Sequence, residues 1–217
     1  MSRLKEKKLI TSNPLLDTIV QSGKGNLFFT TDFHDLGAND AIRKGLSRLT
    51  KEKLLVRLGP GIYLFPDYDP ELGLLYPSTE EIAEAIAKHE RARIIPTGSQ
   101  ALYKLGLSTQ IPMKAVYLTD GMRRTIKLGK RTITFKITTP RKLATKGKIS
   151  SLVIQALQGL GKDQVDKEVI NQIKKVLIKE DPQLLRHDAK LAPVWIATLL
   201  FSLFKELRHD RMAETNR

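Results

Sequence analysis

The sequence contains no cysteine. This absence excludes disulfide bonds, thiol nucleophiles and every zinc site built on thiolates, and it is compatible with the cytosol. Histidine is scarce too: the four histidines are scattered without the spacing of metal ligands. We interpret them as ordinary surface or capping residues. The sequence therefore predicts no metal site and no cofactor, and we expect a cytoplasmic protein.

Long apolar runs are missing as well. The longest, Leu191 to Phe204, is 14 residues long and includes Pro193, whereas a membrane-spanning helix needs about 18 or more. We expect this run to form a buried terminal helix, and we expect no contact with a membrane. The basic segment from Met1 to Thr11 has no apolar run of signal-peptide length behind its charges, and we interpret it as a frayed terminus.

Motifs typical of enzymes are incomplete. Gly23-Lys24-Gly25 lacks the rest of a phosphate-binding loop, and Gly98-Ser99-Gln100 lacks the glycine that follows the serine of a nucleophile elbow. Asp120, directly before Gly121, is interpreted as a turn residue. We predict no catalytic residue and no enzymatic activity. A metal-dependent nucleic-acid-processing enzyme using Asp120 stays open as an alternative, and it requires at least two carboxylates to converge.

Positive charge is what the chain has in excess. It carries 37 Lys and Arg against 23 Asp and Glu, a net charge of +14. Such a charge favours a polyanionic partner, of which nucleic acid is the commonest.

One long stretch has no acidic residue at all. Between Gly121 and Lys162 no Asp or Glu occurs, whereas ordinary surfaces mix the two signs. We interpret this stretch as a second nucleic-acid surface, the alternative being a solvated sheet face and loop. Its eleven basic residues are Arg123, Arg124, Lys127, Lys130, Arg131, Lys136, Arg141, Lys142, Lys146, Lys148 and Lys162.

The segment from Asn39 to Lys51 predicts a basic amphipathic helix. At about 100° per residue, Ile42, Leu46 and Leu49 share one side. We expect Asn39 or Asp40 to cap its start. The basic and polar residues are on the other side of the helix. The candidates for contacts with base edges are Arg43, Lys44, Ser47 and Arg48, and the candidates for contacts with phosphates are Lys51, Lys53 and Arg57.

The surrounding elements predict a winged helix-turn-helix. Before the basic helix, the sequence predicts a helix over 14–22, a short strand over 27–30 and a short helix over 31–37 that Thr31 or Asp32 caps. After it come two short strands, 55–58 and 62–65, joined by a turn at Gly59-Pro60-Gly61. In this motif the basic helix enters the major groove of double-stranded DNA, and the hairpin contacts phosphates nearby.

The fold class predicted for the whole chain is α+β, with two domains. We place a winged helix-turn-helix at 1–65, a linker rich in proline and acidic residues at 66–78, and a mixed α/β domain with a small sheet and several helices at 79–217. In the second domain we expect helices over 79–91, 99–105, 151–160, 163–177 and 184–207, and strands over 115–118, 124–128 and 131–138. In the last strand Ile133, Phe135 and Ile137 are predicted to share the buried face.

Short segments of the chain resemble the AbiEi-type antitoxins of bacterial abortive-infection systems, which act in phage defence. The likeness runs from about Leu15 to Trp195. It is carried by Arg57-Leu58-Gly59-Pro60-Gly61-Ile62-Tyr63, Leu105-Gly106-Leu107-Ser108-Thr109-Gln110, Tyr117-Leu118-Thr119-Asp120-Gly121 and Thr138-Thr139-Pro140-Arg141.

The resemblance implies a winged helix joined to an antitoxin-type C-terminal domain. It implies a repressor that binds inverted repeats upstream of its own operon, and an antitoxin that counters a nucleotidyltransferase toxin without needing to touch it. The basic surfaces of the family correspond here to Arg43, Lys44, Arg48 and Arg57, and then to Arg123, Arg124, Lys127 and Arg131. The alternative left open is a ligand-responsive winged-helix regulator, for which a large, mostly apolar pocket in the C-terminal domain would be the sign.

Overall fold

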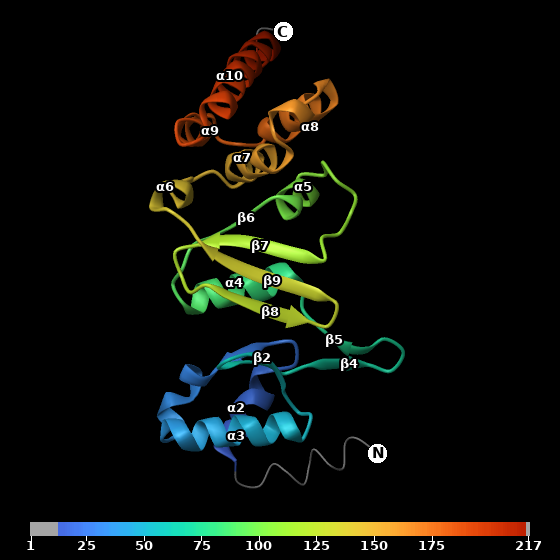
Figure 1. The fold of residues 1–217 in the computed structure, drawn as a ribbon, viewed down its shortest axis with the longest axis vertical. Coiled ribbons are helices and arrows are strands. Elements are labelled where there is room, and N and C mark those ends of the chain that lie inside the picture. The colour runs from blue at the N-terminus through green and yellow to red at the C-terminus, as the bar shows by residue number, and fades with distance from the viewer. Residues whose placement is uncertain (1–12, 216–217) are drawn as a thin grey trace. The chain divides into compact units, whose positions relative to one another are not determined.

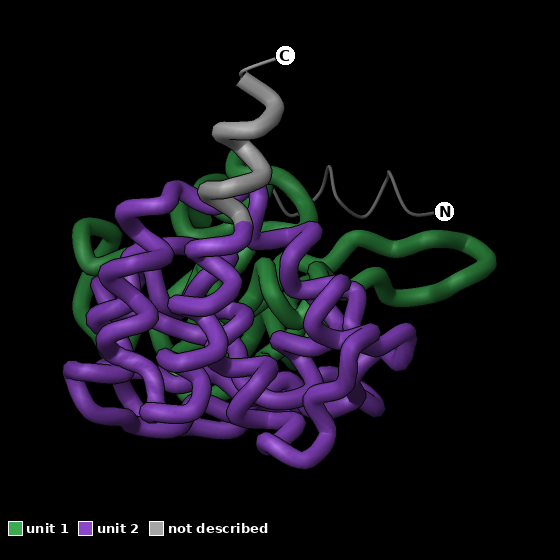
Figure 2. The backbone as a smooth tube through the Cα atoms, turned by 90° about the horizontal axis from the view of Figure 1, so that it is seen from above, with its two compact units in different colours: residues 1–85 green, residues 86–217 purple. Residues whose placement is uncertain are grey.

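The computed structural model describes residues 13–215, with side chains described for residues 13–206. It is an α+β fold, as predicted, and it divides into two compact units, residues 1–85 and 86–217 (Figure 2). The prediction made for Met1 to Thr11 lies outside the described residues. The division falls within a helix, α4, rather than in the segment 66–78 that the composition suggests as a linker.

Unit 1 begins with three helices around a small sheet. The order is α2 (Pro14–Ser22), β1 (Leu27–Phe29), the 3-10 helix η1 (Thr30–Leu36), α3 (Asn39–Lys51), β2 (Val56–Gly59) and β3 (Ile62–Leu64). The three strands pair antiparallel in the order β1-β3-β2. Gly61 has a φ of +72°, the left-handed conformation that the tight turn between β2 and β3 requires.

The predicted helix caps of unit 1 are wrong. Asn39 is the first residue of α3 rather than its cap, and the capping position is Ala38, with no side-chain hydrogen bond. Asp32 lies inside η1, where its carboxylate accepts a hydrogen bond from the Phe29 amide at 2.7 Å. The start of η1 is thus fixed from three residues downstream instead of from a capping residue.

The core of unit 1 is built by the apolar stripes of its helices. Ile19 of α2, Phe33 of η1 and Leu46 of α3 are at most 1 % exposed. The rings of Phe28 and Phe33 stack with their centroids 5.8 Å apart. α2 and α3 approach closely at Gly45, where an added Cβ atom would lie 2.8 Å from a methyl group of Leu15. This packing fixes which side of α3 faces the solvent.

The segment predicted as a linker forms a hairpin of β4 (Asp67–Asp69) and β5 (Gly73–Leu75) (Figure 1). The carboxylate of Asp69 accepts hydrogen bonds from the amides of Glu71 and Leu72, both at 2.8 Å, which organises the turn. These two hydrogen bonds lower the pKa of Asp69, and the bond from the Leu72 amide has the larger effect. The composition shows a turn-rich segment here but does not reveal that it pairs with itself.

Unit 2 contains a four-stranded sheet. α4 (Thr79–His89) leads into it, and the sheet is formed by β6 (Ile94–Pro96), β7 (Lys114–Thr119), β8 (Arg124–Leu128) and β9 (Arg131–Ile137), with α5 (Ser99–Lys104) between β6 and β7. The order is β6-β7-β9-β8; β7 and β9 are parallel, and the other pairs are antiparallel.

The predicted strands of the sheet are present, with one correction to their burial. Ile133 and Phe135 of β9 are buried, as predicted, but Ile137 is 66 % exposed. Ile137 is the last residue of β9, and its partner in the sheet, Thr119, is the last residue of β7. On β9 the burial therefore ends at Phe135, although Thr119 on β7 is still buried.

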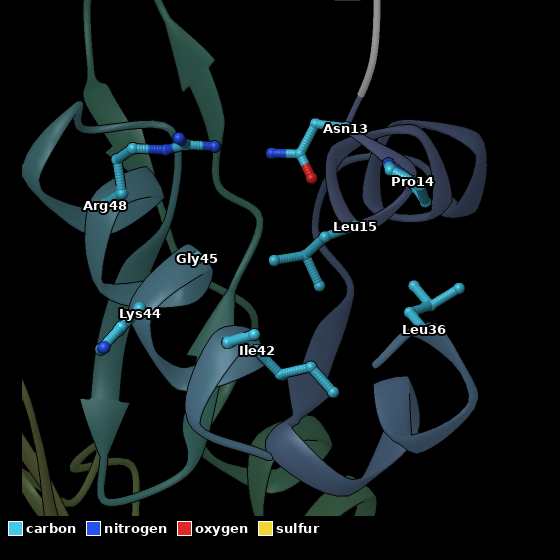
Figure 3. Close-up of a pocket in the computed structure, with 9 residues that line it drawn as sticks. Asn13, Pro14, Leu15, Leu36, Ile42, Lys44, Gly45 and Arg48 are labelled. Carbon is cyan, nitrogen blue, oxygen red and sulfur yellow. The ribbon is translucent and has the colours of Figure 1, made fainter. Parts of the chain in front are cut away.

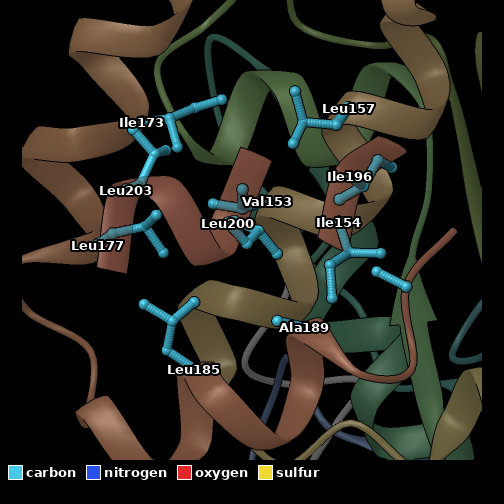
Figure 4. Packing of buried hydrophobic residues seen from close by; sticks show 11 residues of the cluster. Val153, Ile154, Leu157, Ile173, Leu177, Leu185, Ala189, Ile196, Leu200 and Leu203 are labelled. Carbon is cyan, nitrogen blue, oxygen red and sulfur yellow. The ribbon is translucent and has the colours of Figure 1, made fainter. Parts of the chain in front are cut away.

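The rest of unit 2 is helical and has its own core (Figure 4). The elements are α6 (Pro140–Leu143), α7 (Lys148–Leu160), the 3-10 helix η2 (Lys162–Gln164), α8 (Lys167–Leu177), α9 (Pro182–Ala189) and α10 (Val194–Thr215). Val153, Ile173, Ile196 and Leu200 are fully buried between these helices. The apolar run near the C-terminus thus divides between α10 and the turn before it.

Two carboxylates hold the start of α7. Asp188 of α9 is fully buried and accepts hydrogen bonds from the amides of Lys146 and Gly147, both at 2.9 Å, and from the hydroxyl of Ser150 at 2.6 Å. Glu180 accepts from the amides of Ile149 and Ser150, both at 2.8 Å. The first amides of a helix have no partner within the helix, and here side chains from about 30 to 40 residues downstream supply it.

Candidate nucleic-acid interface

α3 presents the polar face that the sequence predicts. Its apolar residues Ile42, Leu46 and Leu49 are at most 4 % exposed, so the helix cannot rotate without losing its core packing. The predicted residues of the opposite side all lie on the surface: Arg43, Lys44, Ser47, Arg48 and Lys51. Each of these side chains is therefore accessible to a ligand that approaches α3 from the solvent.

Acidic residues interrupt this face only at its ends. Asp40 is exposed in the first turn of α3, and Glu52 directly follows the helix. The Nε atom of Arg48 lies 4.0 Å from the carboxylate of Glu52, and both side chains are well exposed. An exposed ion pair of this kind contributes little to stability, so Arg48 can exchange Glu52 for another anion at little cost. The central turns of α3 thus carry Arg43, Lys44 and Arg48 and no carboxylate of their own.

The turn after α3 and the β2–β3 hairpin place the other predicted residues. Lys53 is exposed and has a φ of +61°, so the chain reverses there before it enters β2. Arg57 on β2 is exposed, and its Nε atom donates a hydrogen bond to the carbonyl of Gly59 at 3.3 Å. This bond orients the guanidinium along the hairpin and leaves its terminal nitrogens available.

A pocket of about 380 Å³ adjoins α3 (Figure 3). It lies between the start of α2, the end of η1 and the side of α3 next to α2. Apolar residues form part of its wall, and Asn13, Lys44 and Arg48 contribute the polar part. The lining residues are Asn13, Pro14, Leu15, Leu36, Ala41, Ile42, Lys44, Gly45 and Arg48.

The predicted basic residues of unit 2 are distributed over several elements. Lys127 of β8 and Lys136 of β9 alternate with buried residues, so they share the solvent side of the sheet. Lys130 and Arg131 lie at the β8–β9 turn, Arg123 lies in the loop before β8, and Arg141 and Lys142 are on α6. These seven side chains are exposed. The stretch is basic throughout, but it is not one continuous strip along a single element.

Arg124 differs from the other basic residues of unit 2. Its guanidinium pairs with the carboxylate of Glu90, and its side chain is only 19 % exposed. Burial lowers the pKa of Arg124. The alternation of β8 places Arg124 on the same side as Ile126 and Leu128, which are buried. Arg124 therefore stabilises the fold, and we remove it from the candidate contacts to nucleic acid.

Asp120 has a structural partner as well. Its carboxylate accepts a hydrogen bond from the Arg93 amide at 2.7 Å and another from the Arg93 side chain at 3.0 Å. The bond from the Arg93 amide is the main reason that the pKa of Asp120 is lowered, and the side chain of Arg93 adds to it. Asp120 thus anchors the chain before β6 to the end of β7.

The part of the chain that the structure describes contains neither a candidate metal site nor a candidate membrane-spanning helix. No group of three or more His, Asp or Glu side chains there is arranged to hold a metal ion. Within the same residues, no helix is both long and apolar enough to span a membrane.

Sequence reasoning misses one polar residue beside α3. The sequence indicates Asn13 only as the start of α2, yet its side chain makes no capping hydrogen bond and lines the pocket next to Arg48. The missing cap cannot be read from the sequence, because Asn before Pro is a common start of a helix whether or not its side chain caps.

Comparison with known proteins gives one family. Residues 14–185 match the model of a family described as "Family of unknown function (DUF6088)". This range includes α2 to α8 and part of α9, and so most of both units. No curated protein matches the chain.

Proposed function

We propose that this chain, which belongs to the DUF6088 family, is a sequence-specific DNA-binding repressor and the antitoxin of a type IV toxin–antitoxin system. On this proposal it binds inverted repeats in double-stranded promoter DNA, represses its own operon and counters a nucleotidyltransferase toxin in the cytoplasm. The observation that carries the DNA-binding half is α3, a helix locked by its apolar side with its cationic side open to solvent.

The arrangement of unit 1 supports a winged helix-turn-helix. Two helices, α2 and η1, precede α3, and a tight hairpin follows it, with β1 completing the sheet in the order β1-β3-β2. In such a motif the helix in the place of α3 enters the major groove, while the hairpin contacts the backbone. Arg43, Lys44, Ser47 and Arg48 are then the candidates for base edges, and Lys51, Lys53 and Arg57 for phosphates.

The antitoxin half is supported by the resemblance to AbiEi-type antitoxins. Three of the four segments that carry this resemblance fall on defined elements of unit 2: residues 105–110 follow α5, residues 117–121 close β7, and residues 138–141 join β9 to α6. Residues 105–110 and 138–141 connect helices to the sheet, and residues 117–121 lead from β7 toward β8. The exposed basic residues around them form the candidate antitoxic surface, and their partner is a polyanion or an acidic surface.

The experiment that tests the repressor is a binding assay on the DNA upstream of the gene. We expect a sequence-selective complex that the double variant Arg43→Ala/Arg48→Ala abolishes. The matched control is Lys24→Ala/Lys88→Ala, which removes the same charge from the turn after α2 and from α4. Equal affinity of the wild-type protein for promoter and random duplex DNA would refute the repressor proposal.

The antitoxin is tested by rescue of bacteria that express a neighbouring nucleotidyltransferase gene. We expect the full chain to restore growth, and we expect Arg43→Ala/Arg48→Ala to restore it equally, because the antitoxic surface is assigned to unit 2. Failure of both proteins to restore growth would remove the antitoxin half and leave the repressor half untouched.

The second candidate function is a ligand-responsive winged-helix regulator. The pocket beside α3 is the observation that favours it, since its volume is within the range of small-molecule sites. The pocket lies in unit 1, however, whereas this function is expected to place its sensor in the C-terminal domain. A shift of promoter affinity caused by a small metabolite would support this second function.

A further inference from the structure

The pocket beside α3 combines an apolar wall with an excess of hydrogen-bond donors. Leu15, Leu36 and Ile42 supply the apolar part, and Lys44 and Arg48 supply two cations without a carboxylate among the lining residues. A pocket of this composition suits a ligand that has both an anionic group and a carbon skeleton.

The donors converge on one place. Arg48 of α3 and Asn13 at the start of α2 extend toward each other across the pocket, and each presents N–H groups to the space between them (Figure 3). Arg offers five donors and accepts none. The acidic neighbour of Arg48 is Glu52, whose exposed carboxylate approaches the Nε atom only to 4.0 Å. A ligand group with several acceptor oxygen atoms matches these donors.

The position of Arg48 on α3 separates it from Arg43. Five residues apart, the two side chains leave the helix axis about 140° from each other. Arg48 is on the flank that also carries Ala41 and Gly45, which line the pocket toward α2. Arg43 is on the opposite flank and does not line the pocket. The two arginines therefore cannot have equivalent surroundings when α3 meets a ligand.

We propose that this pocket binds one sugar–phosphate segment of the DNA backbone. Arg48 and Asn13 donate to the phosphate oxygens, and the apolar wall packs against the deoxyribose. The inference rests on the proposed DNA-binding function and changes one detail of it: Arg48 positions the protein on the duplex, and Arg43, Lys44 and Ser47 read the sequence. Phosphate contacts of this kind fix register without carrying sequence information.

The test uses the full chain and promoter duplexes in which one phosphate at a time is replaced by a neutral methylphosphonate. We expect one position in each half-site to weaken binding by the wild-type protein about tenfold, the size of one charge-assisted hydrogen bond. The same replacement should weaken binding by Arg48→Ala and by Asn13→Ala less than it weakens binding by the wild-type protein, because each variant has already lost one of the donors to that phosphate.

The controls separate this contact from general charge and from folding. Gln21→Ala and Lys24→Ala change an exposed amide and an exposed cation of unit 1 that do not line the pocket. Both should keep the full effect of the methylphosphonate. Arg48→Lys keeps the charge but loses the planar donor geometry, and we expect it to retain part of the effect. Arg48→Ala should weaken promoter and random DNA by the same factor, whereas Arg43→Ala should reduce the preference for the promoter.

Three results would overturn the inference. If the losses of affinity caused by the variant and by the methylphosphonate multiply at every position, the pocket does not contact a phosphate. Sequence-selective binding would in that case still support the proposed function. If 2-deoxyribose 5-phosphate at micromolar concentration displaces promoter DNA from the wild-type protein but not from Asn13→Ala, the pocket serves a free sugar phosphate instead. If the wild-type protein shows no selective binding, the proposed function and this inference fall together.

Discussion

Asp120 shows how a single acidic residue in a basic region is used. The sequence leaves it as a turn residue or as a candidate acid, and the structure pairs it with the backbone amide and the side chain of Arg93. A carboxylate that accepts such bonds is stabilised in its charged form, which is why its pKa is lowered. Its two bonds to Arg93 are structural, and the described residues include no group of three or more His, Asp or Glu side chains that could hold a metal ion.

We therefore predict a pH-dependent contribution of Asp120 to stability. Because its folded-state pKa lies below the unfolded value of about 4, the contribution is present above pH 4 and is lost as the pH falls through the folded-state pKa. The side chains of Arg93 and Asp120 are more than a third exposed, so solvent screening limits the gain to roughly 1 kcal/mol or less.

The measurement is thermal unfolding of the wild-type protein and of Asp120→Asn between about pH 2 and pH 7. The wild-type protein should unfold at the higher temperature at neutral pH, and the two curves should converge at the acidic end of the range. A difference that stays constant over the whole range would contradict this assignment.

At the scale of elements, the start of α7 depends on a residue that has no side chain. An added Cβ atom on Gly147 would lie 2.5 Å from Oε2 of Glu180 and close to the hydroxyl of Ser150. Both groups are already committed, since Glu180 accepts from the Ile149 and Ser150 amides and the Ser150 hydroxyl donates to Asp188. Neither can move without breaking these bonds.

We predict that Gly147→Ala destabilises unit 2 by about 1–3 kcal/mol, the cost of overpacking a filled site. The matched control is Lys148→Ala at the next position, which is exposed and opens α7, and it should change stability by less than about 0.5 kcal/mol. Urea unfolding followed by far-UV circular dichroism measures both. An unchanged midpoint for Gly147→Ala would show that the carboxylates are not rigidly held.

Elements with a strong period are predicted well from the sequence, and pairings are not. The limits of α3 follow from the recurrence of Ile42, Leu46 and Leu49 and match the structure. The parallel pairing of β7 with β9 escapes prediction, because β8 comes between them in the chain and no local pattern decides which strands become neighbours. β6 is missed, since three residues ending in proline make a weak strand signal.

The candidate interface also has one part that the sequence predicts and another that it does not. The cationic side of α3 follows from helical periodicity alone. The pocket does not, because it depends on how α2, η1 and α3 pack, and its lining residues come from positions 13 to 48. The burial of Arg124 is missed for a similar reason: its partner, Glu90, lies 34 residues earlier in the chain.

For the whole molecule, the net charge of +14 predicts steep salt dependence if both units contact DNA. The logarithm of the binding constant falls with the logarithm of salt by about 0.9 for each neutralised phosphate. The solvent side of the sheet and α6 supply four exposed cations that can be removed together: Lys127, Lys136, Arg141 and Lys142.

We predict that the fourfold Gln variant at these positions binds the promoter with a salt slope shallower by roughly 2–4, about one unit for each phosphate that is no longer neutralised. Fluorescence anisotropy between about 50 and 300 mM salt measures this slope. The control is Lys175→Gln/Lys179→Gln, which removes one exposed cation in the last turn of α8 and another just after the helix. An unchanged slope together with failed rescue would assign the four residues to the antitoxic task instead.

The two carboxylates at the start of α7 also decide where this protein can be shortened. A fragment that ends at Leu185 retains Glu180 but lacks Asp188, and with it the acceptor for the Lys146 and Gly147 amides. It also lacks the cluster members beyond its end, which leaves the apolar sides of α7 and α8 uncovered: Ala189, Ala192, Ile196, Leu200 and Leu203. We expect such a fragment to aggregate on expression. Crystallisation and binding studies of unit 2 should therefore retain α10 at least to Glu206.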